Sequence, residues 1–311
     1  MHNIICIAGP TASGKTALAV ELAKCVNGEV VSCDSMQVYK RMDIGTAKPT
    51  TEEMQGIPHH MLDVAEPTED FSVSRYCEMA TPIVDDILSR GKTAIIAGGT
   101  GLYMDALIRG NSFAPYPSTG MREKLEAQAD AEGMEAMLKL LASIDPDSAQ
   151  RLHLADRKRI IRALEVYYET GETITTHNLK TQQIPPRYDA LWFGLEDENR
   201  QDLYDRIDSR VEKMLAAGLI EEIQALLDSG IPEKSTAMQA IGYKEFIDAL
   251  QGRCTMAEST AQVQQSSRHY AKRQLTWFRR NPAIHWLRRK QGETTDEILI
   301  RAQQISAEFD K

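Results

Sequence analysis

The segment that decides the fold reads Gly9-Pro10-Thr11-Ala12-Ser13-Gly14-Lys15-Thr16. It has the G-x-x-x-x-G-K-[ST] spacing of a phosphate-binding loop. The apolar run Ile4–Ala8 precedes it and the helical pattern Lys15–Val26 follows it, so the loop stands between a predicted strand and a predicted helix. In such loops, backbone N–H groups and the N-terminus of the helix bind an anion. The sequence therefore predicts that the protein binds a diphosphate or a triphosphate.

Two side chains of this loop have defined roles in phosphate binding. Lys15 can reach the outer phosphate, and the hydroxyl of Thr16 can ligate Mg²⁺, with ATP or GTP as the default ligand. Such enzymes usually place an acid at the end of another core strand. Here one apolar run ends in the acid-free segment Gly98–Gly101, whereas the predicted strand Glu29–Cys33 is followed by Asp34. Asp34 is thus the one well-placed acid, either as a metal ligand or as a catalytic base.

The composition narrows the class of protein. A chain of 311 residues with 42% hydrophobic residues can form one large core and a smaller domain. It contains no run of 18 apolar residues, and a strand predicted from Ile4 leaves no room for a signal peptide. Its five cysteines lack the spacing of metal sites or of a disulfide framework. We expect a reduced, cytoplasmic protein that does not contact a membrane.

Strand and helix patterns alternate through the first 110 residues. Strands are predicted at Ile4–Ala8, Glu29–Cys33 and Thr93–Ala97, and helices at Lys15–Val26 and Val73–Arg90. Short apolar runs joined through helices are typical of a parallel sheet that is covered on both faces. The predicted fold class is therefore α/β, with a P-loop-type parallel sheet core flanked by helices.

The pattern becomes almost entirely helical after this region. A strand pattern returns at Ala190–Gly194. This change predicts a helical insertion domain at residues 113–188, within a catalytic core formed by residues 1–112 and 189–311. The later elements of the core are predicted as helices at Arg200–Ala217, Leu219–Ser229, Ala257–Phe278 and Thr295–Phe309, with a short strand at Ile284–Leu287.

Charge is distributed unevenly along the chain. The net charge is −9, yet the stretch Arg268–Lys290 holds eight basic residues and no acidic one. Aromatic residues, among them Tyr270 and Trp277, are interleaved with these basic residues. Basic groups can neutralise phosphates and aromatic rings can stack on unpaired bases. The stretch is equally typical of a solvated basic helix, and either aromatic residue could belong to the core.

Six further segments, in this order behind the phosphate loop, carry a resemblance to one family. They are Asp34-Ser35-Met36-Gln37-Val38-Tyr39, Asp43-Ile44-Gly45-Thr46-Ala47-Lys48-Pro49, Pro58-His59-His60, Gly98-Gly99-Thr100-Gly101-Leu102-Tyr103, Arg162-Ala163-Leu164-Glu165-Val166 and Ala271-Lys272-Arg273-Gln274-Leu275-Thr276-Trp277. From about residue 4 to residue 290, the chain resembles bacterial tRNA dimethylallyltransferases. The resemblance implies a monomer that transfers a dimethylallyl group from dimethylallyl diphosphate to tRNA. The acceptor would be N6 of the adenosine on the 3′ side of the anticodon, position 37.

The resemblance also implies roles for individual residues. The phosphate loop would hold the diphosphate of the donor, whose charge Lys15 and Mg²⁺ on Thr16 would neutralise. Arg210 stands where relatives place an arginine on the pyrophosphate, although by itself it is an ordinary helix charge. Asp34 would take the proton of the attacking amine, or would only ligate Mg²⁺. Thr100 would orient that amine, unless it serves only the turn.

Contact with the anticodon stem-loop of tRNA is implied at a second group of residues. The target base must leave its stack to be modified. Gln37 is suited to pair with N6 and N7 of adenine, while Ser35 can instead serve a turn. Arg159 and Arg162 are three residues apart on a predicted helix and share a face. The full set of tRNA-binding candidates is Asp34, Ser35, Met36, Gln37, Thr100, Arg122, Lys158, Arg159, Ile160, Ile161, Arg162 and Arg273.

Two interpretations from other classes remain open at this point. One is an NTP-dependent kinase or phosphotransferase with a small acceptor, in which the helical insertion is a lid and the basic stretch a phosphate clamp. The other is a nucleotide-gated RNA-binding protein. The phosphate loop alone favours the kinase. The segment Asp34–Pro49 and the basic stretch favour prenyl transfer to tRNA.

Overall fold

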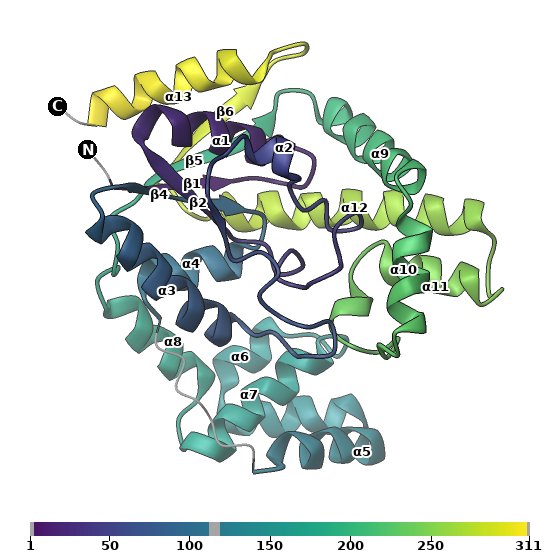
Figure 1. Ribbon diagram of the computed structural model, residues 1–311. Helices are drawn as coiled ribbons and strands as arrows, with labels where there is room; N and C mark the ends of the chain where they lie inside the picture. Colours follow the sequence, from purple (N-terminus) through teal and green to yellow (C-terminus); the bar gives the residue numbers. More distant parts are fainter. Residues whose placement is uncertain (1–2, 112–118, 310–311) are drawn as a thin grey trace. The chain divides into compact units, whose positions relative to one another are not determined.

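The fold is built on a six-stranded parallel sheet. The computed structural model describes residues 3–111 and 119–309 (Figure 1). The strands are β1 (Ile4–Ala8), β2 (Gly28–Ser32), β3 (His59–His60), β4 (Thr93–Gly98), β5 (Leu191–Asp197) and β6 (Ile284–Arg289). Their order is β3-β2-β4-β1-β5-β6, and all neighbours are parallel. The predicted α/β fold class is confirmed.

Helices cover both faces of this sheet. The helices of the core are α1 (Lys15–Val26), α2 (Thr51–Met54), α3 (Val73–Ser89), α4 (Gly101–Arg109), α9 (Arg200–Ala216), α10 (Leu219–Asp228), α11 (Tyr243–Leu250), α12 (Met256–Phe278) and α13 (Thr295–Phe309). A single 3₁₀ turn is described in addition, at Ala237–Gln239. Helices α1 and α13 lie on one face, and α3 and α4 on the other (Figure 1). Within the described residues, no helix is both long enough and apolar enough to span a bilayer.

The core explains why the central strands are apolar without alternation. Ile5 and Ile7 of β1 pack with Leu18 and Leu22 of α1 and with Ile298 of α13. All five residues of β1 are buried, because the strand has a helical layer on each side. β1 lies between β4 and β5 in the middle of the sheet. The chain therefore leaves the sheet at its centre when it enters the phosphate loop, which is where ligands bind in open parallel sheets.

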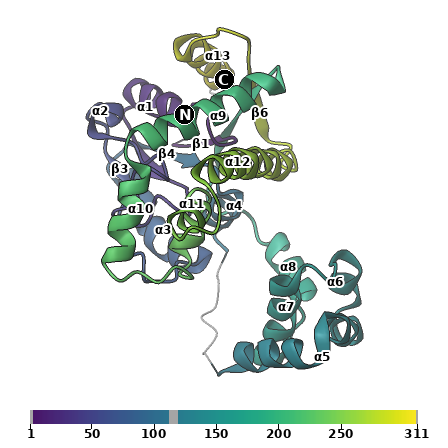
Figure 2. The ribbon, with the colours of Figure 1, turned by 90° about the vertical axis from the view of Figure 1, so that its right-hand side faces the viewer.

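The insertion is a separate compact unit of helices (Figure 2). It spans Asn111–Pro186, while the core comprises Met1–Gly110 and Arg187–Lys311. Its helices are α5 (Met121–Ile144), α6 (Pro146–Arg151), α7 (Arg157–Thr170) and α8 (Ile174–Gln183). The unit ends two residues before the predicted boundary, since the backbone N–H groups of residues 187 and 188 bond to the end of α4. The predicted start at residue 113 lies outside the described residues.

The helical unit has its own core. Ile160, Ile161 and Leu164 of α7 pack with Leu125 and Leu141 of α5. The helical patterns of the sequence predict two helices, at Met121–Ala131 and Met134–Ser143, where the structure has the single helix α5, and Gly133 marks the division. This residue has non-helical backbone angles (φ 81°, ψ 163°), which kink the helix there.

Candidate active site and basic pocket

The carboxyl ends of β1, β2 and β4 meet at one edge of the sheet. Asp34 follows β2 and Thr100 follows β4, and the backbone N–H of Thr100 bonds to the carbonyl of Cys33 (3.2 Å). A Cβ on Gly98 would lie only 2.0 Å from that carbonyl oxygen, so the close approach of the two strand ends requires glycine there. The approach places the Thr100 hydroxyl within 3.0 Å of the backbone N–H of Ser35, from which it accepts a hydrogen bond.

The phosphate loop follows β1 at this edge and leads into α1. Lys15 Nζ donates a hydrogen bond to the carbonyl of Pro10 (2.6 Å), which holds its ammonium group over the loop. Ser13 Oγ is buried and makes no hydrogen bond within the described residues. A buried hydroxyl without a partner is unfavourable, so it is available to a phosphate oxygen. The loop therefore fits the anion that its sequence predicts.

Two cations lie together at the phosphate loop. Burial chiefly, together with the nearby Arg210, lowers the pKa of Lys15 to about 7, while Asp34 opposes the shift. Burial also lowers the pKa of Arg210, against an opposing effect of Asp34. Within the described residues no carboxylate forms an ion pair with either cation, and Asp208, on the same helix as Arg210, pairs with Arg268 (2.5 Å). Positive charge without a protein partner favours an anionic ligand.

The candidate base and the candidate orienting residue lie beside each other. Asp34 is half-buried, and its Oδ1 accepts a hydrogen bond from the backbone N–H of Met36 (2.9 Å). Thr100 Oγ1 lies 3.3 Å from Ser35 Oγ, to which it donates. Burial raises the pKa of Tyr270 to about 12, Asp34 adds to the rise, and a hydrogen bond with Thr100 opposes it. The structure thus brings Asp34 and Thr100 together with a phenol from α12.

Gln37 is held by its own loop. Its Oε1 accepts a hydrogen bond from Ser32 Oγ (2.9 Å), and its Nε2 donates to the carbonyls of Thr46 (3.3 Å) and Ala47 (3.1 Å). Both ends of the amide are therefore engaged. To pair with adenine as predicted, Gln37 must give up these hydrogen bonds within the loop. The side chain of Met36, beside it, is half-buried.

Helix α12 carries three of the four aromatic residues of the basic stretch, Tyr270, Trp277 and Phe278. The indole Nε1 of Trp277 donates to Asp105 Oδ2 (2.8 Å), and the guanidinium of Arg280 lies 4.0 Å from the ring centroid. Trp277 is therefore a packing residue between α12 and α4, which settles the alternative that the sequence leaves open for it. Arg273 is exposed, and its guanidinium lies 5.5 Å from the ring centroid of Tyr270.

Sequence reasoning missed three side chains at the phosphate loop. Gln274 of α12 accepts a hydrogen bond from the loop backbone (2.9 Å), and Arg206 Nε of α9 donates to the carbonyl of Ala12 (3.0 Å). The guanidinium of Arg289, at the end of β6, lies against Gly14. Gln274 belongs to one of the family-like segments, but no local pattern indicates that it reaches a loop more than 260 residues away.

The loop also fits a magnesium ion. No group of three or more His, Cys, Asp or Glu side chains that could hold a metal occurs in residues 3–111 and 119–309. The oxygen atoms that could bind such an ion are the hydroxyls of Ser13 and Thr16 in the loop and the carboxylate of Asp34. Mg²⁺ usually takes one or two protein ligands and completes its shell with phosphate oxygens and water. The residues present therefore suit Mg²⁺ bound together with a phosphate ligand.

Most of the predicted tRNA-binding residues of the helical unit line one pocket. This pocket, here called the basic pocket, has a volume of about 500 Å³ and is lined by Arg122, Ser148, Arg151, Leu152, Lys158, Arg159, Arg162, Ala163 and Ile174. Ile160 and Ile161 are also predicted contacts, but both are fully buried in the core of the unit. A buried side chain cannot reach RNA, so these two residues hold α7 in place and leave the contacts to their charged neighbours.

Arg151 is the basic residue of this pocket that sequence reasoning missed. Its Nη2 donates to the hydroxyls of Thr175 (3.1 Å) and Ser148 (3.5 Å). Both hydroxyls in turn donate to the buried carboxylate of Asp145. Burial acts to raise the pKa of Asp145, but the hydrogen bonds from Thr175 and Ser148 outweigh it and lower this pKa. In the described part of the chain Arg151 has no ion pair, so its charge is oriented without being neutralised.

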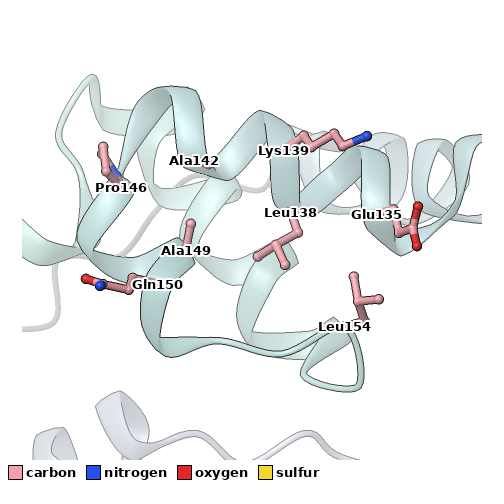
Figure 3. A pocket seen from close by; sticks show the side chains of 8 residues that line it. All are labelled: Glu135, Leu138, Lys139, Ala142, Pro146, Ala149, Gln150 and Leu154. Carbon is pink, nitrogen blue, oxygen red and sulfur yellow. The ribbon is translucent and has the colours of Figure 1, made fainter.

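A second pocket in the same unit is apolar. It has a volume of about 510 Å³, and Figure 3 shows its lining residues, which are Glu135, Leu138, Lys139, Ala142, Pro146, Ala149, Gln150 and Leu154. Only one of these residues is basic, against five in the basic pocket. The basic pocket therefore carries more positive charge than the apolar pocket of the same unit, and a polyanion would be attracted to it.

Together, these features define a class of protein. A parallel α/β sheet carries a phosphate-binding loop after its central strand. Two cations without carboxylate partners lie at the loop, and a carboxylate lies at the end of a neighbouring strand. This is a P-loop-type protein that combines an anion site with a second polar site at the same edge of its sheet.

Comparisons with known proteins identify the family within this class. The family model described as IPP transferase matches residues 37–281. The tRNA dimethylallyltransferase of Acetivibrio thermocellus is 43% identical over 310 residues, which is 99% of each chain. The tRNA dimethylallyltransferase 1 of Trichlorobacter lovleyi is 47% identical over 293 residues, covering 94% of this chain and 96% of the relative. The chain belongs to the IPP transferase family, as the resemblance predicts.

Solved structures agree with this assignment. The tRNA isopentenylpyrophosphate transferase of Bacillus halodurans matches with a TM-score of 0.75 and 40% identity, over 100% of this chain and 97% of that one. A eukaryotic dimethylallyltransferase acting on tRNA matches with a TM-score of 0.85 and 31% identity, over 98% of this chain and 79% of that one. The chain therefore shares both the fold and nearly the whole length of these relatives.

Proposed function

We propose that the protein transfers a dimethylallyl group from dimethylallyl diphosphate to N6 of the adenosine on the 3′ side of the tRNA anticodon. Membership of the family supports the transfer of this group to tRNA. The observation that carries the mechanism is the juxtaposition of two unneutralised cations, Lys15 and Arg210, with the carboxylate of Asp34. This arrangement suits a leaving group of high negative charge beside an acceptor that must lose a proton.

The donor side of the reaction is assigned to the phosphate loop. The bond between the dimethylallyl carbon and the diphosphate oxygen breaks, and the diphosphate leaves with the electron pair. The loop N–H groups, Lys15 and Arg210 stabilise this developing charge. Mg²⁺ held by Thr16 would supply further neutralisation. Burial lowers the pKa of Lys15, whereas a bound diphosphate favours the charged form of its side chain and therefore raises this pKa again.

The acceptor side is assigned to the ends of β2 and β4. The lone pair of the N6 amine attacks the dimethylallyl carbon, and Asp34 accepts the proton that the amine loses. The Thr100 hydroxyl, oriented by the backbone N–H of Ser35, hydrogen-bonds the amine. The new C–N bond forms as the C–O bond breaks, so the products are the prenylated base and free diphosphate.

The tRNA is proposed to be held by the anticodon stem-loop. The target adenine must leave the stacked bases of the anticodon loop before it can react. The protein must therefore bind the rest of the anticodon stem-loop. The basic pocket would bind backbone phosphates, which position RNA without reading its sequence. We further propose that the protein acts as a monomer. We expect it to act in the cytoplasm, because its substrate is tRNA.

One assay tests this proposal. The protein is incubated with Mg²⁺, an unmodified tRNA transcript and labelled dimethylallyl diphosphate, and the RNA is digested to locate the label. We expect label on the adenosine beside the anticodon and none on a transcript that carries guanosine at that position. Hydrolysis of ATP without transfer of label would instead support the NTP-dependent kinase, which the comparisons do not favour.

A further inference from the structure

One face of α12 contacts both halves of the candidate active site. Tyr270, Gln274 and Trp277 are spaced four and three residues apart, so they share a face of the helix. Tyr270 hydrogen-bonds Thr100, and Trp277 bonds Asp105 in α4. Gln274 lies between them and is 4% exposed. Helix α12 is therefore anchored on each side of this glutamine.

Gln274 joins the phosphate loop to the turn that carries Thr100. Its Oε1 accepts a hydrogen bond from the backbone N–H of Thr11 (2.9 Å), and its Nε2 donates to the carbonyl of Gly99 (2.9 Å). A Cβ on Gly99 would lie 2.1 Å from Nε2, so the amide lies directly against the backbone of the turn. One side chain thus bridges the donor side and the acceptor side.

Only an amide satisfies both ends of this bridge. Thr11 offers a donor and Gly99 an acceptor, and a glutamine side chain presents one acceptor oxygen and one donor nitrogen. A carboxylate of the same length would place an oxygen against the Gly99 carbonyl, while methionine would offer neither a strong donor nor a strong acceptor. The bridge is therefore sensitive to changes that preserve the size of the side chain.

We propose that Gln274 is a positioning residue that sets the distance between the donor diphosphate and the acceptor amine. This inference rests on the proposed function. The reacting carbon is attached to the diphosphate in the loop, whereas the attacking amine lies beside Thr100, next to Gly99. Reacting atoms must approach to about 3–3.5 Å, and a displacement of about 1 Å can cost about 10²-fold in rate. A bridge between these two backbone segments controls that distance without touching either substrate.

The test compares Gln274→Met and Gln274→Glu with the wild-type enzyme. We expect the single-turnover rate of prenyl transfer to fall by at least about tenfold in both variants. In Gln274→Met, the affinities for pyrophosphate and for tRNA should change by less than about threefold, because no group that binds them has been removed and no charge has been added. Hydrogen exchange should show loss of protection at the Thr11 amide in Gln274→Met, which lacks the acceptor oxygen, and not in Gln274→Glu, which keeps it. Gln265→Glu, on an exposed position of the same helix, is the matched control and should leave all three properties unchanged.

Two results would overturn the assignment. One is a single-turnover rate within about threefold of wild type in both variants. The other is a fall in both affinities of Gln274→Met as large as its fall in rate, which would indicate a purely structural role. Both variants lose the amide nitrogen that donates to the Gly99 carbonyl. If only one of them folds, its rate alone therefore decides whether the inference holds. A wild-type enzyme that fails to label tRNA would refute the proposed function, whereas active variants beside an active wild type would refute this inference alone.

Discussion

Asp34 is the residue on which the acceptor chemistry depends. One of its carboxylate oxygens is bound by the backbone N–H of Met36, which fixes the orientation of the group. The carboxylate interacts electrostatically with Lys15 and Arg210, and within the residues that the structure describes it forms no ion pair with either of them. An oriented carboxylate next to two cations can accept a proton while the positive charges serve the leaving group.

Replacement of this carboxylate should slow chemistry without weakening RNA binding. Asp34→Asn keeps the shape of the side chain but removes the proton acceptor, so we expect single-turnover prenyl transfer to fall by about 10²- to 10⁴-fold. The affinity for tRNA, measured by filter binding, should remain within about threefold of wild type. A variant with full turnover would show that Asp34 is not the base.

Arg210 should contribute through the leaving group. Arg210→Gln removes a cation beside the phosphate loop, and loss of one stabilising group in a buried site costs about 10²- to 10³-fold in rate. The expected result is a slower single-turnover rate, measured by rapid quench at saturating donor. Arg200→Gln, at an exposed position of the same helix, is the matched control. Unchanged single-turnover kinetics in Arg210→Gln would contradict the assignment.

Residue roles could be predicted from the sequence only where they are local. Lys15 and Thr16 belong to a short motif whose geometry follows from the sequence around it. Gln274 and Arg206 reach the loop through the packing of α12 and α9, which no nearby pattern specifies. Ile160 was predicted as an RNA contact because a family segment was carried over whole, although helical periodicity turns that position into the core.

At the scale of elements, one buried carboxylate, Glu29, connects several strands and a helix of the core. Glu29 in β2 is 3% exposed and bonds to Arg90 after α3, Lys92 before β4 and His60 in β3. Hydrogen bonds from Arg90 chiefly hold the pKa of Glu29 well below its usual value, with burial opposing and Lys92 and His60 adding to the effect. The cluster therefore ties three strands and a helix to an ionised group.

Neutralisation of this group should destabilise the core. Glu29→Gln removes the charge of a buried carboxylate and leaves the partly exposed cations Arg90 and Lys92 without their partner. Loss of one member of a fully buried ion pair costs about 3–5 kcal/mol, and solvent screening of these two cations makes the expected loss smaller. Because the folded pKa is lowered, the stabilisation is present above about pH 4.5 and is lost as the pH falls below that value. Urea unfolding at pH 7 and pH 3.5 should show a gap between variant and wild type that narrows at the lower pH. Glu212→Gln, at an exposed position, is the control, and an equal effect of both substitutions would contradict this account.

The basic pocket should act on RNA through charge. Arg151→Gln removes one cation that has no carboxylate partner, so the affinity for tRNA should fall and its dependence on salt should flatten by about one unit of slope. Lys139→Gln, in the apolar pocket, is the matched control and should leave the slope unchanged. The measurement is a salt titration of tRNA binding. Equal slopes for Arg151→Gln and wild type would exclude a phosphate contact at this residue.

Elements were predictable where apolar periodicity was strong. β1 and α1 have the predicted bounds, and most other predicted elements differ by one or two residues. α4 was missed because it begins in the segment Gly98–Gly101, whose composition is typical of a turn. α8 was missed because it is largely polar, and a side-chain cap from Thr173 marks its start. α11 follows Gly242, whose N–H is capped by the carboxylate of Glu245.

At the scale of the whole molecule, the protein is acidic overall but carries positive charge in two local regions. The net charge is −9, yet positive groups gather at the phosphate loop and in the basic pocket. An acidic remainder limits non-specific attraction to nucleic acid, while local basic groups bind phosphates. The order of the strands could be inferred only through the resemblance to a family, because pairing across the sheet depends on contacts that local patterns do not encode. The limits of the helical unit depend likewise on where the chain rejoins the end of α4.

The central claim is that the phosphate loop binds a leaving diphosphate and not a nucleotide to be hydrolysed. The most direct test is to count pyrophosphate released against prenyl groups transferred in a single turnover without any nucleoside triphosphate. We predict equal amounts of the two products at equal rates, with both slowed together in Asp34→Asn. Transfer that requires ATP, or transfer without release of pyrophosphate, would contradict the account.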